Sequence, residues 1–218
     1  MTPRRSFLTR LGFATAALGL GTAGSAKASA ERTQDTAGAR WQPARDAKDD
    51  WFDQVPGKHR LFFDVLTAQG TSDAQGFAAN YFDGSKSGYG LENTDVALVI
   101  CLRHMSTPLA FGDAIWAKYG TILGESLKLT DAKTGQAPIV NTHWTALEQL
   151  VKRGVHFAVC DMASHRFAGL VARRTDGNAD AIYREMVASV IGNAHFVAAG
   201  IIAVNRAQER GYSIAYVG

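Results

Sequence analysis

A set of short apolar runs, rich in Val, Ile and Phe, constrains the fold of this chain more than any other feature. Most of these runs lack strict alternation of apolar and polar residues, which is typical of strands buried on both faces of a parallel sheet. The runs lie at residues 60–67, 95–104, 155–163, 194–199 and 212–217. Because helical segments separate them, they predict a single-domain α/β fold of three layers, with a mainly parallel sheet of about five strands and right-handed crossovers.

The segments between these runs carry signals for helix ends. Thr107 and Pro108 form an N-cap and first-turn pair, and Gly120 is expected to end the helix that they begin. A capping box at residues 145–148 begins another helix, which is expected to end at Gly154. Apolar residues that recur on one helical face predict further helices around residues 72–82, 179–190 and 201–211.

Three stretches fall outside this alternation. Residues 31–57 are polar, and we expect an extended N-terminal arm whose aromatic residues, such as Trp51, pin it to the body or to a neighbouring subunit. Residues 84–90 are expected to form a flexible loop, and residues 121–142 a long excursion before the third run. Long loops in compact domains are usually functional or packed against partners.

Residues 1–30 have the order of an export signal. Arg4 and Arg5 lie in a charged start, an uncharged run spans residues 11–25, and small residues lead to Ala30. This order predicts a signal peptide that is cleaved after residue 30, and the paired arginines are similar to the twin-arginine signal. The alternative is an ordinary basic start of a signal peptide. The uncharged run is too short for a membrane span, which needs about 20 apolar residues. We therefore expect a periplasmic or otherwise exported protein with no membrane span after cleavage.

The positive charge of the chain belongs to this leader. Lys and Arg number 23 and Asp and Glu number 20, for a formal net charge of +3. Four of the basic residues and none of the acidic ones lie in residues 1–30, which leaves 19 basic and 20 acidic residues in the rest. No basic patch with interleaved aromatic residues remains, so the composition argues against a nucleic-acid partner.

The ends of the apolar runs select the candidate site, because ligands of open parallel sheets bind outside the carboxyl ends of the strands. The second run ends at Arg103 and His104, the third contains Cys160, and the fourth ends just before Gly200. Arg103 and His104 precede the expected helix start at Thr107, where free N–H groups can hold an anion. We expect catalytic roles for Cys160, His104, Arg103 and His165, and ligand-binding roles for Thr107, Asp161 and Gly200.

Cys160 has two interpretations. A thiolate is a nucleophile, and nearby cations such as Arg103, His104 and His165 favour it if the second and third strands are neighbours. The alternative is that Cys160 only packs, since free cysteine is among the most buried residue types. His104 likewise has a structural alternative, a ring that hydrogen-bonds a neighbouring loop. Cys101 lies inside its run, and a disulfide between the two cysteines would require Cα atoms within about 7 Å of each other.

Three segments together resemble the DsrE/DsrF-like family, which includes sulfur-relay subunits. They are "VALVICLRHMSTPLAFGDAIWAKYG" (96–120), "GVHFAVCDMAS" (154–164) and "VAAGIIAVNRAQERGYSIAYV" (197–217). The resemblance covers residues 58–218 and, with the leader, is to the exported, twin-arginine branch. It implies a flavodoxin-like α/β domain that forms homo- or hetero-oligomers, often trimers or hexamers. In the sulfur-relay members, the cysteine that matches Cys160 accepts a sulfane sulfur as a persulfide and passes it on. This chain departs from them in its export and in the insertion before the third strand, so its sulfur donor and acceptor must differ.

The first functional hypothesis is therefore sulfur handling, by a sulfurtransferase-like carrier with a persulfide on Cys160. The alternative is a non-catalytic module of the same fold, which binds a small ligand or mediates oligomer assembly. A third hypothesis is a redox-cofactor protein, because the loop at residues 67–72 places hydroxyls where flavodoxin-type proteins hold a phosphate. Ligand types for zinc occur among His104, Cys160, Asp161 and His165, but their spacing matches no known zinc motif, so we predict neither a metal site nor a resident cofactor.

Overall fold

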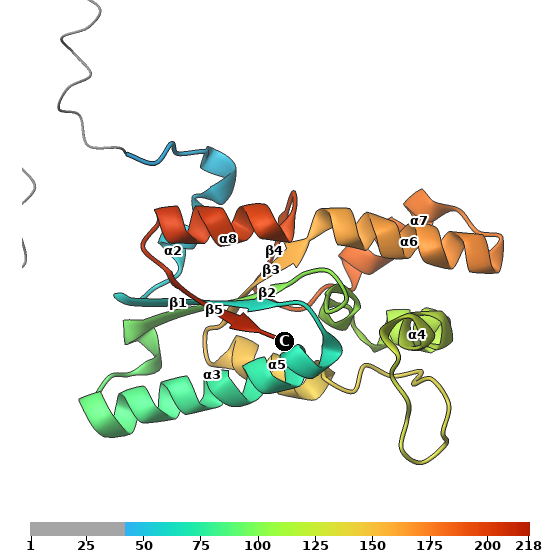
Figure 1. Cartoon of the computed structure of the whole chain (residues 1–218), viewed down its shortest axis with the longest axis horizontal. Helices are drawn as coiled ribbons and strands as arrows, with labels where there is room; N and C mark the ends of the chain where they lie inside the picture. Colours follow the sequence, from blue (N-terminus) through green and yellow to red (C-terminus); the bar gives the residue numbers. More distant parts are fainter. Residues whose placement is uncertain (1–41) are drawn as a thin grey trace, which may run out of the picture. The chain divides into compact units, whose positions relative to one another are not determined.

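The computed structural model describes residues 42–218, of which residues 44–218 form one compact unit (Figure 1). The predicted signal peptide, residues 1–30, and the first residues of the predicted arm lie outside the described part of the chain. Within residues 42–218, no helix has the length and apolar character needed to cross a membrane.

Five strands form one sheet in the order β4-β3-β2-β1-β5, and all four neighbouring pairs are parallel. This sheet, covered by helices on both faces, confirms the predicted three-layer α/β fold and its flavodoxin-like layering. The strand order differs from the 2-1-3-4-5 order of flavodoxin itself. The strands are β1 (His59–Val65), β2 (Val96–Leu102), β3 (His156–Cys160), β4 (Ala194–Val197) and β5 (Ser213–Val217).

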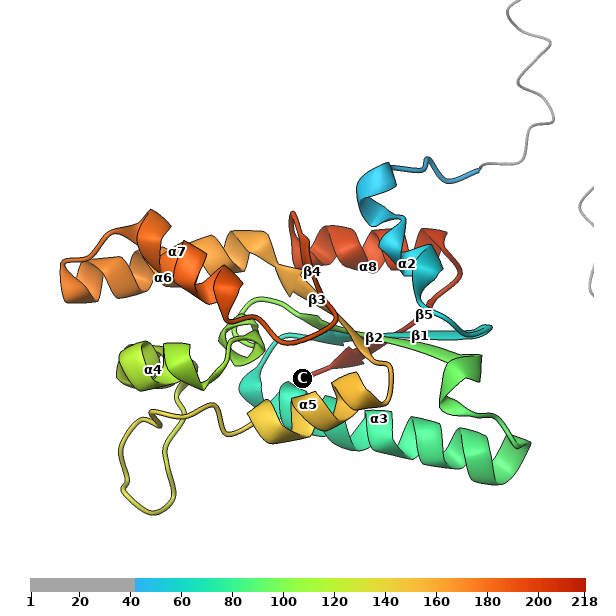
Figure 2. The same cartoon turned by 180° about the vertical axis from the view of Figure 1, so that it is seen from behind.

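The direction of the chain across the sheet decides which face each helix covers. From β1 to β4 the chain moves in one direction, with α3 and α5 on one face, and it then returns to β5 through α8 on the opposite face (Figure 2). Right-handed crossovers require this change of face when the direction reverses. The helices are α2 (Trp51–Gln54), α3 (Ala68–Tyr89), α4 (Asp113–Leu127), α5 (Trp144–Lys152), α6 (Asp161–Thr175), α7 (Ala179–Ala188) and α8 (Gly200–Glu209), with 3₁₀ turns at Ala47–Asp49, Asn93–Asp95 and Thr107–Ala110.

Both faces of the central strand β2 are buried, as the unbroken apolar runs predicted, whereas the edge strands β4 and β5 are partly exposed. Along β2, Leu98 and Ile100 belong to a large core that also contains residues of α3, α4, α5, α6 and α7. Val99 and Cys101, which point the other way, belong to a smaller core with α2 and α8. The two sets alternate because successive side chains of a strand point to opposite faces.

The segment assigned to the N-terminal arm contributes to this smaller core. Trp51 and Phe52 are buried among its members, and the Tyr212 hydroxyl donates a hydrogen bond to the Phe52 carbonyl (2.7 Å). Arg60 donates to the same carbonyl at 3.1 Å. Residues 44–57 are thus part of the compact unit and cover the face of the sheet that carries α8.

One expected loop is helical, and the expected long excursion begins later than predicted, after Leu127. Residues 84–90 were expected to be a flexible loop, but α3 continues through Tyr89 and ends with Gly90 in the left-handed conformation (φ 67°). Of residues 121–142, those up to Leu127 extend α4. Gly84 and Gly88 each cost the helix up to about 1 kcal/mol relative to Ala. The helix continues through them because each residue added to an established helix gains a further hydrogen bond.

The expected helix from Thr107 to Gly120 is also wrong in its ends. Residues 107–110 form a 3₁₀ turn, and α4 begins only at Asp113. Gly120 lies inside α4, where the backbone of Pro138 packs closely against the helix. A Cβ on Gly120 would come within 2.6 Å of the Pro138 carbonyl oxygen. This glycine permits a close approach and does not end the helix.

Candidate functional site

A cavity of about 260 Å³ lies at the carboxyl edge of the sheet, where the ends of β2, β3 and β4 meet the first turns of α6 and α8. It brings together four of the predicted site residues from three separate strand ends. The residues that line it are Arg103, His104, Cys160, Met162, Ala163, Arg166, Ala199, Gly200 and Ile201.

Cys160 is both the last residue of β3 and the N-cap residue of α6. Its thiol is free, and the residue is 7% exposed, on the wall of the cavity. The Ser164 hydroxyl donates to the Cys160 carbonyl at 2.9 Å, which fixes the backbone at this junction. A helix N-terminus carries partial positive charge, and such an environment stabilises a thiolate.

Arg103 is held by a carboxylate that sequence analysis did not select. Its Nε and Nη2 donate to the two oxygens of Asp64 at 2.5 and 2.9 Å, a bidentate pair in which both side chains are largely buried. The hydrogen bond to Asp64 raises the pKa of Arg103. Asp64 lies opposite Cys101 in the register of β1 and β2, so it points to the same face as the cavity.

Gly200 belongs to the site because it makes room for Arg103. A Cβ at position 200 would lie 2.4 Å from the Cβ and 2.5 Å from the Cδ of Arg103. Gly200 is the first residue of α8, so the arginine side chain crosses directly over the start of that helix on its way to Asp64. Gly200, which we expected to make room for a ligand, therefore makes room for the Arg103 side chain.

Arg166, from the second turn of α6, is a further cation that sequence analysis missed. Its Nη2 donates to the His104 carbonyl at 3.1 Å, and its Nη1 lies 3.5 Å from the His104 ring Nδ1. His104 has a left-handed backbone conformation (φ 57°) that turns its carbonyl toward α6. The signal for Arg166 is its spacing from Cys160, which becomes readable only once α6 is known to begin at residue 161.

Cys101 is near the site but sealed from it. It is fully buried, and burial, followed by the charge of Asp64, raises the pKa of its thiol well above the ordinary value. Cys101 lies opposite Ala158, two residues before Cys160, so about 6.6 Å of strand rise separates the two cysteines in addition to the strand spacing. This separation exceeds the Cα distance of a disulfide, and both thiols are free.

Three predicted residues lie elsewhere. Thr107 is buried and donates to the Leu102 carbonyl at 3.3 Å, away from the cavity. Asp161 accepts a hydrogen bond of 2.5 Å from the Tyr183 hydroxyl, and the His165 ring stacks on Tyr183 with centroids 3.8 Å apart. Burial and then the bond to Asp161 raise the pKa of Tyr183 to about 12. Since α6 begins at residue 161, positions 163 and 166 face the cavity, whereas 161 and 165 face α7.

The loop after β1, considered for a cofactor phosphate, is covered by the chain itself. Thr67 caps α3 by accepting a hydrogen bond from the Gly70 N–H at 2.9 Å. A Cβ on Gly70 would come within 2.4 Å of the Val217 carbonyl oxygen, so the backbone that ends β5 packs directly on this loop. Among residues 42–218, no three His, Cys, Asp or Glu side chains gather as metal ligands.

No protein-family profile and no curated protein matches this sequence. Among solved structures, the fold is similar to that of a protein of unknown function from Methanobacterium thermoautotrophicum. That match covers 73% of this chain and 99% of that chain, with a TM-score of 0.41 and 12% sequence identity. The fold assignment therefore rests on the sheet and helices of this chain.

Proposed function

We propose that Cys160 carries a sulfane sulfur as a persulfide and that the cavity beside it binds an anionic sulfur donor. The observation that supports this proposal most is the position of the Cys160 thiol. It is free, belongs to the N-cap residue of a 15-residue helix and borders a cavity with Arg103, His104 and Arg166. Cationic surroundings and a helix N-terminus are the general conditions that activate a thiolate.

The proposed reaction transfers one sulfur atom from a donor to an acceptor and needs no external oxidant or reductant. With thiosulfate as donor, the Cys160 thiolate attacks the outer sulfur atom, a new S–S bond forms, and the S–S bond of thiosulfate breaks to release sulfite. The resulting persulfide anion retains the charge of the thiolate. An acceptor thiolate then attacks the outer sulfur, and Cys160 leaves as a thiolate again.

The two arginines have different parts in this scheme. Arg103 uses two donors on Asp64, which leaves the others of its guanidinium for a ligand. Arg166 meets no carboxylate within 4.0 Å among the described residues, so its charge is uncompensated at the mouth of the cavity. We assign it the larger share of anion binding, with the His104 ring as a further polar contact.

Loading with thiosulfate tests the proposal. Mature protein is incubated with thiosulfate, alkylated under native conditions and digested, and the peptide that contains Cys160 is searched for the added mass of one sulfur atom. We expect the addition in the native chain and in Cys101→Ser, and its loss in Cys160→Ser. A native chain whose Cys160 gains no sulfur from thiosulfate or from an organic persulfide contradicts the proposal.

The second candidate function is a non-catalytic binding module, which the low exposure of Cys160 favours. At 7% exposed, the thiol contributes little of the cavity surface, and the arginines can hold an anion without it. In that case sulfite and thiosulfate bind equally well to the native chain and to Cys160→Ser. Under the persulfide proposal, Cys160→Ser still binds the donor but releases no sulfite.

Export and oligomerisation belong to the same proposal. The leader supports export by the twin-arginine pathway, and sequencing the N-terminus of the mature protein should find residue 31 first. Exposed apolar side chains support a homo-oligomer: Met162 and Ile201, which line the cavity, are 69% and 59% exposed, and Ile202, the next residue of α8, is 46% exposed. Light scattering of the mature protein should then give a trimer or hexamer, and Ile201→Glu should shift it toward the monomer.

A further inference from the structure

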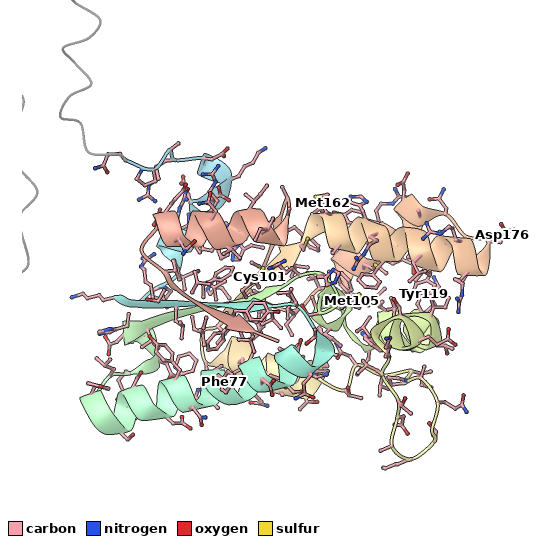
Figure 3. The ribbon with its side chains drawn as sticks, viewed as in Figure 1. Phe77, Cys101, Met105, Tyr119, Met162 and Asp176 are labelled. Carbon is pink, nitrogen blue, oxygen red and sulfur yellow. The ribbon has the colours of Figure 1, made fainter. Side chains whose placement is uncertain are left out.

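A second cavity adjoins the first at Arg166 and runs along α6 toward α4. It has a volume of about 250 Å³, and Arg166 borders both cavities. Beyond Arg166 it is lined by the apolar side chains of Met105, Phe167 and Leu170, by Ser126 of α4, and by Arg173 farther along α6. Figure 3 shows Met105 at the end of the sheet that faces α4 and α6. We refer to the two adjoining cavities as the α6 groove.

The arginines along this groove differ in whether a carboxylate pairs with them, and this difference points to a ligand. Arg174 is paired with Glu125 of α4 at 2.5 Å, so these two charges compensate each other. Arg173, the adjacent residue, has no carboxylate within 4.0 Å among residues 42–218, and neither has Arg166. The groove thus presents one uncompensated cation at its middle and one at its far end, with an apolar floor between them.

The Arg173 side chain reaches back along α6 toward Cys160. A Cβ on Gly169 would lie 3.4 Å from Nη1 of Arg173, so the guanidinium rests over Gly169, one turn nearer to the start of the helix. Positions 160 and 169 are nine steps apart along the chain, which corresponds to about 13 Å along a helix axis. An extended peptide ligand of three residues spans about 10 Å. Its added sulfur atom and a hydrogen bond to the guanidinium span the remaining distance.

From this geometry we propose that the α6 groove binds the sulfur donor, and that this donor is the persulfide of a short cysteine-containing peptide with a free carboxylate at its far end. The outer sulfur lies at Cys160, the peptide backbone covers the apolar floor, and the carboxylate pairs with Arg173. Arginine pairs with carboxylates through two parallel hydrogen bonds. This inference rests on the proposed persulfide function and names the class of donor for it.

The transfer step balances without another reactant. The Cys160 thiolate attacks the outer sulfur of the peptide persulfide, and the S–S bond of the donor breaks. The outer sulfur becomes bonded to Cys160, the proton it carried stays with it, and the peptide leaves as a thiolate. Arg173 acts as a specificity residue, because it contacts the carboxylate of the donor and none of the sulfur atoms.

Two donors of different length test the inference. Glutathione persulfide reaches Arg173, whereas thiosulfate fills only the cavity at Cys160. We expect Arg173→Ala to lower the rate of sulfur transfer from subsaturating glutathione persulfide about fivefold, the scale of one partly exposed ion pair. Transfer from thiosulfate should not change. The matched control is Arg184→Ala, an exposed arginine of α7 outside the groove, which should alter neither rate.

Binding of S-methylglutathione, measured by calorimetry, separates this inference from the proposed function. The compound occupies the groove but transfers no sulfur. If Arg173→Ala weakens its binding about fivefold while no donor loads Cys160, the groove stands and the persulfide function fails. If thiosulfate loads Cys160 but S-methylglutathione does not bind, or if Arg173→Ala and Arg184→Ala behave alike, the inference is overturned and the persulfide function stands.

Discussion

The carboxyl edge of the sheet has two ends that share an architecture but differ in what fills them. At the open end, which we define as the cavity beside β2, β3 and β4, Gly200 begins α8 and the Arg103 side chain crosses it. At the closed end, beside β1 and β5, Gly70 lies in the first turn of α3 and the backbone of Val217 covers it. Both glycines leave no room for a Cβ.

This difference shows why a strand end and a helix N-terminus do not by themselves make a site. At the closed end Thr67 accepts the Gly70 N–H, and the covering Val217 backbone leaves no surface for a ligand. A side chain that crosses the same kind of helix start brings charge to it and leaves space at its flanks, which is the cavity lined by Cys160 and Arg166. The open end is therefore the one for which we propose binding and reaction.

The largest effect is expected from removing the carboxylate that supports the open end. Asp64→Ala should lower the free energy of unfolding by about 3 kcal/mol, because it leaves the Arg103 charge largely buried without a partner. Urea denaturation of the mature chain measures it. The control is Asp83→Ala, whose carboxylate is 71% exposed beside Arg153 and should matter by less than about 1 kcal/mol. Equal losses of unfolding free energy in the two variants would mean that the Asp64 ion pair stabilises the chain no more than a surface ion pair.

At the closed end, Gly70→Ala should lower the free energy of unfolding by about 2 kcal/mol, because the new Cβ meets a backbone carbonyl that cannot rotate away. Gly76→Ala, in the same helix, is the control: a Cβ there meets nothing within 4 Å, so it should raise stability by about 0.5 kcal/mol. Thermal unfolding of both variants gives the signs. A neutral Gly70→Ala would show that β5 does not seal this end.

The two cysteines sharpen the contrast between the open end and the core beneath it. Native Cys160 should react with iodoacetamide at least about tenfold faster than Cys101 at pH 8, a difference of roughly 1.4 kcal/mol in activation free energy. Burial raises the pKa of the Cys101 thiol and also blocks the reagent. Peptide mapping of the native chain over time measures both rates, with urea-denatured protein as the control in which the rates converge. Comparable native rates would contradict the assignment of Cys101 to a sealed position.

The smallest effect concerns the opposite ends of the strands that border the cavity. His195 stacks on Trp51 with centroids 4.0 Å apart, and burial, together with the neighbouring His156, lowers the pKa of His195 to about 4. The unfolded chain binds this proton near pH 6.5, so the free energy of unfolding should fall as the pH drops from about 6.5 to about 4. His195→Phe keeps a ring against Trp51 and should flatten that dependence.

Urea denaturation at pH 7 and pH 5 measures this change. The rate of Cys160 alkylation, corrected for the reagent pH dependence measured on a free thiol, should be the same in His195→Phe as in the native chain at each pH. A parallel loss of stability and of Cys160 selectivity on acidification would mean that the open end depends on packing around Trp51. Such a result would break the separation between the two regions.

The fold was predictable because its signal is repeated along the chain. Continuous apolar runs marked every strand to within a few residues, and glycines such as Gly211 marked helix ends. The predicted helix ends were wrong where one residue type can have two structural roles. Gly120 ends no helix because the chain at Pro138 packs against it, and nothing near Gly120 in sequence reports a contact that distant.

The candidate site was predictable in the part that depends on strand ends alone. Cys160, Arg103, His104 and Gly200 end strands or follow them, and the cavity contains all four. His165 was selected and Arg166 was not, although Arg166 borders the cavity. Which side chains of α6 face the cavity depends on where the helix begins, and no capping residue in the sequence marks that position. Asp64 escaped notice inside an apolar run, where its role depends on Arg103 of the next strand.

The hydrogen bond from Tyr212 to the Phe52 carbonyl joins residues 160 positions apart, and β5 pairs with β1 over a similar distance along the chain. Loops of this length close slowly, so these contacts form late in folding. Until β5 has been synthesised, β1 has an unpaired edge and Phe52 lacks its contact with Tyr212. A nascent chain without β5 therefore exposes a strand edge that can pair with other chains and aggregate.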